Sequence, residues 1–419
     1  MQEELAPLAG IRVVELTTAW AGPMAGRTLA FLGAEVIRIE PASRPDSWRH
    51  PKITFNHNRY PDRDPGLRPH NRSSLFNTQN INKLSMALDL KLPGGHETLV
   101  RLLAMTDVVI SNFTPGTLDR LKIGYQQLRQ LKKDIIVLEM PAFGNSGPMA
   151  NNPALGPTME MVTGMASLIG YPGGPPTVTG PAYLDPTGGY NAAAAIMTAL
   201  VYRQASGEGQ HIELPQCEAA MQYIGEVILS AVATGENPQP QGNRVPWAAP
   251  HDTFPALGDD AWVAIAVTND EEWRALCSAI DMPELATDPD YATLPGRLRN
   301  SDALHERIAL WTRSRDKHEA AALLQSAGVP AAPVNTAKDL VHSRYLAERG
   351  FFTTLDHPEA GAHPYQGLPF HLTVTPGAQR RAAPCLGADT HFILSDILKL
   401  SEDEIQVLDA AGTISPIPA

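Results

Sequence analysis

The segment RVVELTTAWAGPMAGRTLAFLGAEVIRIE, residues 12–40, decides the fold class. Residues 12–16 are mostly apolar and β-branched, which predicts a buried strand. A turn of small and polar residues at 17–23 leads into a helix predicted over 24–32. A second strand is predicted at 35–40. Two strands joined through a helix form a βαβ unit, and such units build parallel sheets.

The same alternation continues along the chain. Further strands are predicted at 84–90, 107–113, 135–143 and 210–214, and helices at 95–105, 117–131, 157–169, 187–205 and 217–234. Residues 235–250 are rich in Pro, Gly and Asn and predict a linker. A strand at 262–267 and helices at 270–280, 302–312 and 316–327 follow it. We therefore predict an α/β fold: a Rossmann-like large domain built from both chain ends, 1–235 and 326–419, with a small α+β domain inserted at 240–325.

Composition excludes several classes of protein. The 419 residues carry a formal net charge of −12, which disfavours a general binder of nucleic acid or anionic membranes, because both need a basic field. The three cysteines have no metal-ligand or disulfide spacing. No signal peptide is recognisable, and the longest apolar run, 192–201, is too short to span a membrane. We expect a cytoplasmic protein without a metal site.

The first strand-to-helix turn is the natural ligand site of a doubly wound sheet. It reads TTAWAGPMAG and lacks the dinucleotide fingerprint G-x-G-x-x-G. Two interpretations stay open: a tight structural turn, or an anion site at the helix start. Lys83, Lys91, Asn112 and Arg120 follow predicted strands, and they are either solvated surface residues or part of a phosphate cradle.

Asp185 is the one carboxylate in TVTGPAYLDPTGGYNAAAAIMTAL, residues 177–200. It is a favoured N-cap residue, and Pro186 suits the first helical position. A cap does not explain Gly188 and Gly189, because glycine costs about 1 kcal/mol per residue in a helix. The pair therefore indicates close packing against this backbone. The helix dipole would keep a carboxylate here ionised, and an ionised carboxylate can act as a nucleophile.

Ordered segments from nearly the whole chain point to one family. They are LAGIRVVELTTAWAGP, LGAEVIRIEP, NKLSMALDLK, DVVISNFTPGTLDRLKIGY, FGNSGP, GYPGGPP, TVTGPAYLDPTGG, RQASGEGQHIEL, GNRVP, DDAWVAIAV and APCLGADT. Together they resemble the class III CoA transferases, the family of formyl-CoA transferase and carnitine CoA-transferase, whose fold α-methylacyl-CoA racemases share. The resemblance implies two subunits that interlock as a homodimer. It also implies CoA transfer from an acyl-CoA to a small carboxylic acid, with CoA as substrate and no permanently bound cofactor.

The resemblance also assigns residues. Asp185 matches the catalytic aspartate, which forms an acyl-aspartyl anhydride and then an aspartyl-CoA thioester. The matching CoA-binding positions are Ala19, Trp20, Leu88, Lys91, Asn112, Phe113 and Arg120, with Arg38 and Lys83 as further phosphate partners. We add the hypothesis that backbone N–H groups near Gly188 and Gly189 stabilise oxyanions.

Some positions depart from the family pattern. A basic residue that follows the IRIE strand in some members is Pro41 here, and the glycine lid of some formyl-CoA transferases reads PALGDDAW. Leu155 and Gly156 occupy the region in which racemases carry His and Asp, which disfavours two-base racemisation. A racemase or isomerase and a non-catalytic CoA-ester-binding paralogue remain the alternatives.

Overall fold

A computed structural model describes residues 6–49 and 57–414 of the chain. The chain divides into two compact units. The first unit comprises Met1–Ala166, Val178–Glu236 and Tyr345–Ala419, and the second comprises Ser167–Thr177 and Asn237–Arg344. The second unit therefore interrupts the first in the sequence, and each is described by itself.

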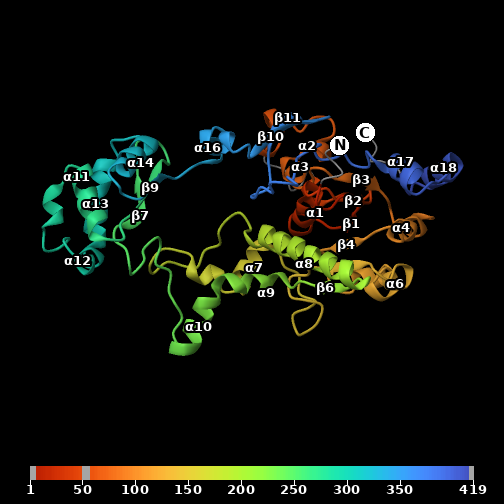
Figure 1. Ribbon diagram of the computed structural model, residues 1–419, viewed down its shortest axis with the longest axis horizontal. Helices are drawn as coiled ribbons and strands as arrows, with labels where there is room; N and C mark the ends of the chain where they lie inside the picture. The colour runs from red at the N-terminus through yellow and green to blue at the C-terminus, as the bar shows by residue number, and fades with distance from the viewer. Residues whose placement is uncertain (1–5, 50–56, 415–419) are drawn as a thin grey trace. The chain divides into compact units, whose positions relative to one another are not determined.

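The first unit is built on a six-stranded parallel sheet, of order β3-β2-β1-β4-β5-β6 (Figure 1). The strands are β1 (Arg12–Leu16), β2 (Glu35–Glu40), β3 (Leu84–Ala87), β4 (Val108–Ser111), β5 (Ile136–Glu139) and β6 (His211–Glu213). Strands β1 and β2 have the predicted bounds, and the others are shorter than predicted. The parallel Rossmann-like sheet predicted from residues 12–40 is confirmed.

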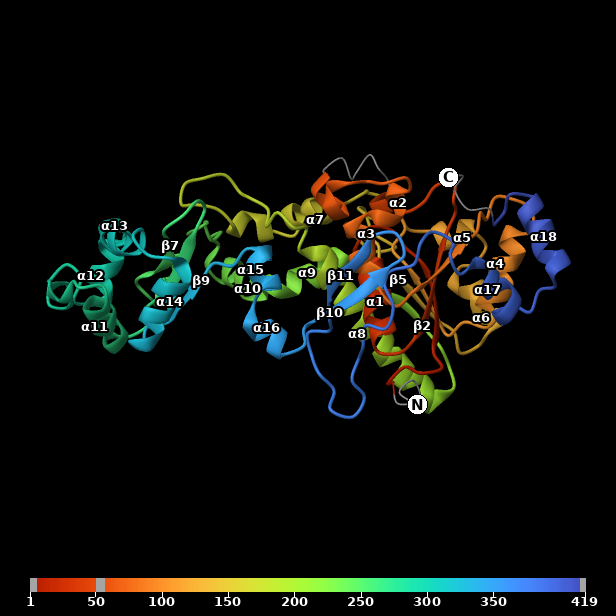
Figure 2. The ribbon, with the colours of Figure 1, turned by 90° about the horizontal axis from the view of Figure 1, so that it is seen from above.

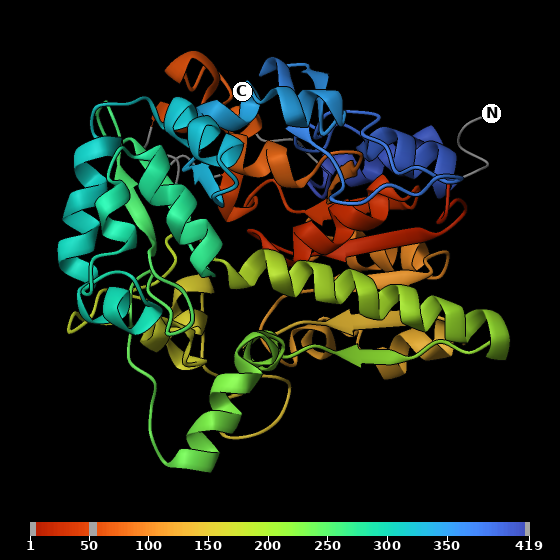
Figure 3. The same cartoon turned by 60° about the vertical axis from the view of Figure 1, so that its left-hand side comes forward.

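Helices cover both faces of this sheet. Successive side chains of a strand point to opposite faces, so neighbouring residues of β1 belong to different cores. Val13 faces a core formed with α1 (Ala21–Phe31) and the long α8 (Leu184–Ser206), which Figure 3 shows running along the sheet. Val14 faces the opposite core, which includes α4 (Gly95–Leu103), α6 (Tyr125–Leu131) and C-terminal segments. Those segments include a π-helical turn (Ile393–Ile397), which directly follows α17 (Thr390–Phe392), and α18 (Glu402–Ala410). Figures 1 and 2 show α17 and α18 beside α4, so the end of the chain completes the first unit.

Two predicted helices are divided in the structure. Residues 117–131 form α5 (Thr117–Arg120) and α6, because Lys122 takes a left-handed conformation with φ of 57°. Residues 217–234 form α9 (Gln216–Met221) and α10 (Gly225–Thr234), with a short 3-10 turn between them. The first unit also contains the short helices α2 (Pro69–Arg72), α3 (Ser74–Gln79) and α7 (Gly156–Val162) and the antiparallel hairpin β10 (Phe352–His357) and β11 (Gly361–Gln366).

The second unit packs helices on a three-stranded antiparallel sheet, β7 (His251–Pro255), β8 (Trp262–Ala266) and β9 (Ala331–Pro333). Its helices are α11 (Asp270–Ala279), α12 (Leu294–Arg299), α13 (Ser301–Thr312), α14 (Lys317–Ser326) and α15 (Ala337–Val341); α16 (Arg344–Glu348) begins at the unit boundary. The unit extends beyond the predicted limit of residue 325, because β9 pairs with β8 and Val329 belongs to the same core.

Candidate active site at the carboxyl edge of the sheet

The strand order reverses between β1 and β4, so the crevice of this fold lies beyond the carboxyl ends of these two strands. The turn Thr17–Trp20 follows β1, and Asn112 follows β4. Asn112 Oδ1 accepts from the Thr18 N–H at 2.9 Å, and Asn112 Nδ2 donates to the Thr18 carbonyl at 2.9 Å. The side chain of Asn112 therefore ties the two strand ends together at the crevice.

Asp185 lies inside helix α8 and is not its cap. The helix begins at Leu184, and the cap position is Tyr183, which makes no side-chain capping bond. The predicted N-cap role of Asp185 is therefore wrong by two positions. Within the described residues, no group donates a hydrogen bond to the Asp185 carboxylate, so no structural bond occupies this side chain.

Helix α8 packs closely against α1, so α8 begins near the turn that joins β1 to α1. A Cβ atom on Gly189 would lie 2.7 Å from the Ala21 carbonyl oxygen and 2.5 Å from Met24 Cβ. Asp185 precedes Gly189 by one helical turn on the same face, and Trp20 directly precedes Ala21. Two segments more than 160 residues apart, Trp20 and Asp185, are thus brought to the same end of neighbouring helices.

This packing also explains the glycine pair. A Cβ atom on Gly188 would lie 2.9 Å from the side-chain oxygen of Gln216, and both glycines are buried. Their backbone N–H groups lie beyond the first four residues of the helix, so they donate to carbonyls one turn earlier. The glycines serve helix packing, and we do not include Gly188 and Gly189 among the proposed oxyanion donors.

A buried carboxylate beside Asp185 was not predicted from the sequence. Glu160 on α7 is fully buried, and its oxygens accept from the Thr179 N–H at 2.8 Å, the Thr179 hydroxyl at 2.7 Å and the Tyr183 N–H at 2.8 Å. Its only sequence signal is a single charge in the apolar stretch GPTMEMV. Gly156, at the start of α7, leaves the space into which the Asp185 carboxylate points.

Burial, followed by the negative charge of Glu160, raises the pKa of Asp185 to about 6. We expected the helix dipole to favour the charged form, but desolvation and the like charge outweigh it. Asp185 is therefore ionised above pH 6 and holds its charge in partly dry surroundings. A carboxylate in this state is a suitable nucleophile.

The structure separates the predicted CoA-binding residues into three groups. Ala19, Trp20 and Asn112 are half-buried at the crevice, and Phe113 packs against the core beside them. Lys91 and Arg120 are exposed and follow β3 and β4, at the same edge of the sheet. Leu88 is fully buried in the core, which leaves only its backbone for a ligand.

Arg38 and Lys83, which the resemblance suggested as phosphate partners, do not lie at the protein surface. Both side chains are fully buried, and both bind Glu15: Arg38 Nη1 and Lys83 Nζ each lie 2.8 Å from Glu15 Oε1. Neither cation is free to meet a phosphate in this conformation. We therefore do not include Arg38 and Lys83 among the proposed phosphate partners. The strand predicted at 35–40 is present as β2, but the sequence did not show that the charged side chain of Arg38 is buried.

Comparisons with known proteins agree with this geometry. The sequence profile described as CoA-transferase family III matches residues 8–390. The chain belongs to CoA-transferase family III. The chain is 31% identical over 408 residues to a succinyl-CoA–D-citramalate CoA-transferase of Chloroflexus aurantiacus, which covers 97% of this chain and 98% of the relative. A formyl-CoA:oxalate CoA-transferase of Afipia carboxidovorans is 28% identical, with 98% of each chain covered. This family III member is thus a CoA-transferase.

The fold of this CoA-transferase is also that of a solved relative. The crystal structure of a CAIB/BAIF family protein from Brucella suis superposes with a TM-score of 0.85, at 29% identity, and covers 94% of this chain and 99% of that chain. Within residues 6–49 and 57–414, no helix is both long and apolar enough to cross a bilayer, and no group of three acidic, His or Cys side chains forms a metal site. A cavity of about 430 Å³ lies within the second unit beside His305, and none of the predicted site residues lines it.

Proposed function

We propose that this CoA-transferase moves CoA from an acyl-CoA donor to a carboxylic acid acceptor through covalent intermediates on Asp185. The names of the relatives pair a CoA ester with an acid such as D-citramalate or oxalate. We propose the same substrate class here: an acyl-CoA and a small carboxylic acid. CoA enters as a substrate, and Asp185 supplies the reacting group.

The steps conserve charge and need no external proton. An Asp185 oxygen attacks the thioester carbonyl, the C–S bond breaks, and an acyl-aspartyl anhydride and CoA thiolate form. The thiolate attacks the aspartyl carbonyl, and the donor leaves as a carboxylate, which gives an aspartyl-CoA thioester. The acceptor carboxylate displaces the thiolate from that thioester to form a second anhydride. The thiolate then attacks the acceptor acyl carbon, which releases the new acyl-CoA and frees Asp185.

One observation carries the proposal: the Asp185 carboxylate lies in the space that Gly156 leaves, one helical turn before the contact of Gly189 with Ala21, and no group among the described residues donates a hydrogen bond to it. A structural carboxylate in partly buried surroundings is normally paired, because an unpaired buried charge is costly. Asp185 instead has a raised pKa and a second carboxylate nearby. Such perturbed groups in a crevice are typical of catalytic residues.

The phosphates of CoA would meet Lys91 and Arg120. Both side chains are exposed, and they follow β3 and β4 at the carboxyl edge of the sheet. Strands lie about 4.8 Å apart, so the ends of β3 and β4, three positions apart in the sheet, are separated by about 14 Å. An extended ligand such as CoA can contact both.

The same proposal includes a homodimer that interlocks. Helix α10 is apolar over most of its length, and the described part of the chain buries none of its residues. Leu229 is 69% exposed and Val232 is 80% exposed. A contiguous apolar surface of this kind favours contact with another protein, and we propose a second copy as the occupant. Sedimentation of Leu229→Glu should then give a monomer where the unmodified protein gives a dimer; a monomeric unmodified protein would remove this part of the proposal.

The mechanism is tested by trapping the intermediate. The protein is incubated with a panel of acyl-CoA donors and quenched with hydroxylamine or borohydride, and the modified residue is found by mass spectrometry. We expect modification at Asp185 and no transfer by Asp185→Ala. Full transfer by Asp185→Ala without modification of Asp185 would refute the mechanism. Deuterium entry at the α-carbon of the acyl group without CoA exchange would favour the racemase alternative.

A further inference from the structure

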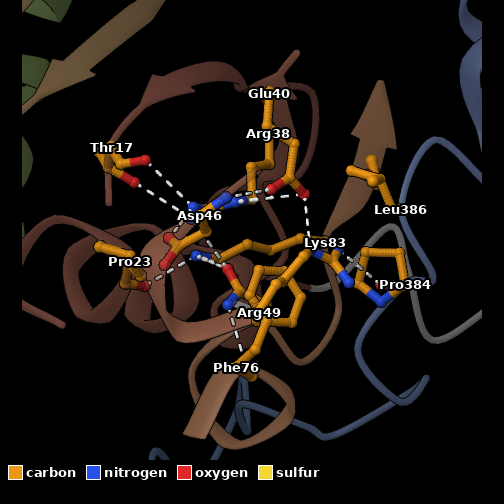
Figure 4. A network of polar contacts seen from close by, with 12 residues as sticks. Thr17, Pro23, Arg38, Glu40, Asp46, Arg49, Phe76, Lys83, Pro384 and Leu386 are labelled. Carbon is orange, nitrogen blue, oxygen red and sulfur yellow. Dashed lines mark hydrogen bonds and ion pairs between the residues drawn. The ribbon is translucent and has the colours of Figure 1, made fainter. Parts of the chain in front are cut away.

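Six ionisable side chains are buried together beneath the turn Thr17–Trp20, and none is more than 5% exposed (Figure 4). We call them the buried charge cluster: Glu15, Arg38, Glu40, Asp46, Arg49 and Lys83. Three carboxylates face three cations, so the formal charges cancel. Burying so many charges is costly even when they are paired, and replacing them by apolar residues is often neutral or stabilising. The fold alone therefore does not account for the cluster.

The contacts of the cluster lead to the backbone of the turn. Arg38 Nη2 donates to the Thr17 carbonyl at 3.0 Å and Arg38 Nη1 to the Thr17 hydroxyl at 3.2 Å. The Ala19 N–H donates to Asp46 Oδ2 at 3.0 Å. Arg38 Nη2 also binds Asp46 directly, so all three contacts to the turn come from one ion pair. Lys83 Nζ extends the same arrangement to the start of α1, because it donates to the Pro23 carbonyl at 2.8 Å.

The turn needs such contacts because Ala19 has a φ of 60°. This left-handed conformation is rare for residues with a Cβ atom and persists where neighbouring groups hold it in place. Asp46 binds the N–H of Ala19 itself, and Asn112 binds both backbone groups of Thr18. Each residue from Thr17 to Ala19 is thus fixed by a different side chain.

We propose that Arg38 and Asp46 are positioning residues, which hold the turn Thr17–Trp20 in the conformation that receives the CoA ester. The inference rests on the proposed function, because the shape of the turn matters for transfer only if the ester binds there. It gives Arg38 a role that differs from direct phosphate binding: the guanidinium acts from inside the protein, through the backbone of the turn. Asp46 acts in the same way and touches no substrate.

Asp46→Asn is the test variant, because it keeps the shape of the side chain and removes one charge from the cluster. Arg38 and the Ala19 N–H both bind Asp46 Oδ2, and the Trp48 N–H donates to Oδ1 at 2.6 Å. In either orientation the amide NH2 group of Asn faces one of these donors, and the charged acceptor that Arg38 and the Ala19 N–H share is lost. Asp107→Asn is the matched control. Asp107 accepts from the Arg12 N–H at 2.8 Å and pairs with Arg203 at 2.9 Å, at the opposite end of β1. Both variants remove the charge of a carboxylate that accepts a backbone N–H bond and pairs with an arginine, but only Asp46 holds the turn.

Two measurements are made on the full chain after circular dichroism has shown that each variant folds. The first is hydrogen exchange of the peptide that covers Thr17–Trp20. We expect faster exchange there in Asp46→Asn and unchanged exchange in Asp107→Asn. The second is steady-state kinetics with an acyl-CoA donor. We expect KM for the donor to rise about tenfold in Asp46→Asn, the effect of one lost charged hydrogen bond, with kcat nearly unchanged.

Ala19→Gly in the Asp46→Asn background separates a positioning role from a general loss of stability. Glycine adopts positive φ without strain, so the double variant should recover part of the lost affinity. Unchanged exchange in the turn, or an equal rise in KM in both single variants, would overturn the inference. If the unmodified protein binds no CoA ester, the proposed function fails, and the exchange experiment still decides whether Asp46 fixes the turn. If Asp46→Asn does not fold, Arg38→Lys is measured in its place, because it keeps the charge and loses the reach to the Thr17 carbonyl.

Discussion

The carboxylate of Glu160 accepts a hydrogen bond of 2.8 Å from the backbone N–H of Tyr183, two residues before Asp185. The same carboxylate binds the N–H and hydroxyl groups of Thr179. Glu160 thus orders the segment that leads into α8 and also places a negative charge near Asp185. Its structural bonds and its electrostatic effect on Asp185 can be separated by mutation.

The first prediction concerns the pH dependence of transfer. Asp185 must be ionised to attack, so kcat/KM should rise with pH and level off above an apparent pKa of about 6. Glu160→Gln removes the like charge and should move this apparent pKa downward, toward the ordinary aspartate range. The measurement is a pH profile of kcat/KM. Thr179→Val is the control, because it removes a hydrogen bond and keeps the charge; a profile that shifts equally in both variants would count against the role of the charge.

The second prediction compares the adjacent glycines of α8. Ala at 189 would press on the Ala21 carbonyl and Met24 Cβ, so Gly189→Ala should lower the free energy of unfolding by about 1–3 kcal/mol. Ala at 188 meets only the movable end of the Gln216 side chain. Gly188→Ala should therefore be nearly neutral, because the helix gains about 1 kcal/mol from replacing glycine. Denaturant unfolding of the two variants checks this order, and equal losses would contradict it.

The third prediction concerns the exposed cations of the CoA site. Arg120→Ala should raise KM for an acyl-CoA by about two- to fivefold, which is the size of an exposed ion pair. The difference should shrink with a donor built on dephospho-CoA if Arg120 meets the 3′-phosphate. Arg101→Ala is the control, since Arg101 is also exposed and pairs with Glu404 on the C-terminal helix. A similar rise of KM in the control would mean that the effect is a general one of surface charge.

The fourth prediction concerns stability in acid. His357 is buried, and its Nδ1 accepts from the Glu359 and Ala360 N–H groups, so the neutral ring is favoured. Burial, aided by the charge of Arg49, lowers the pKa of His357 from 6.5 to about 4. Between these values the unfolded chain binds more protons than the folded chain, so the stabilising contribution is complete above pH 6.5 and is lost as the pH falls to 4.

His357→Asn keeps an acceptor for the two N–H groups and removes the titration. The free energy of unfolding of this variant should therefore depend less on pH between 6.5 and 4 than that of the unmodified protein. Urea unfolding at several pH values checks this. The same pH dependence in both proteins would assign the effect to other groups.

The parallel sheet could be predicted because its strands are apolar and buried on both faces. The segments of β1 and β2 carry β-branched residues between clear turn signals, and their bounds were right to the residue. Helix ends were less predictable. Lys122 breaks a periodic segment by its left-handed backbone conformation, and the one local signal, Gly124 at the N-cap position of α6, was not read as a break. The extent of the second unit depended on the pairing of β9 with β8, which is a long-range contact without a local signal.

The candidate site was only partly predictable for a similar reason. Asp185 lay in a segment with unusual glycines, but the partner of those glycines is α1, and the sequence does not show which helix packs there. The family resemblance suggested Arg38 as a further phosphate partner. Its actual partners, Glu15 and Asp46, come from a neighbouring strand and from the segment after β2. Glu160 was missed because a single carboxylate in an apolar helix has no pattern to reveal it.

The bonds of Arg49 have a consequence for the order of folding. Arg49 Nη2 donates to the carbonyl of Pro384, a residue 335 positions later in the chain, and Asn71 binds the N–H of Leu386. On the ribosome, the segment that carries Arg49 emerges long before these partners exist. The second unit lies almost wholly within one continuous stretch, Asn237–Arg344, and it can close as soon as that stretch is made. The first unit is therefore begun first and finished last. Its buried Arg49 lacks the carbonyl of Pro384 as a hydrogen-bond acceptor until synthesis has nearly ended.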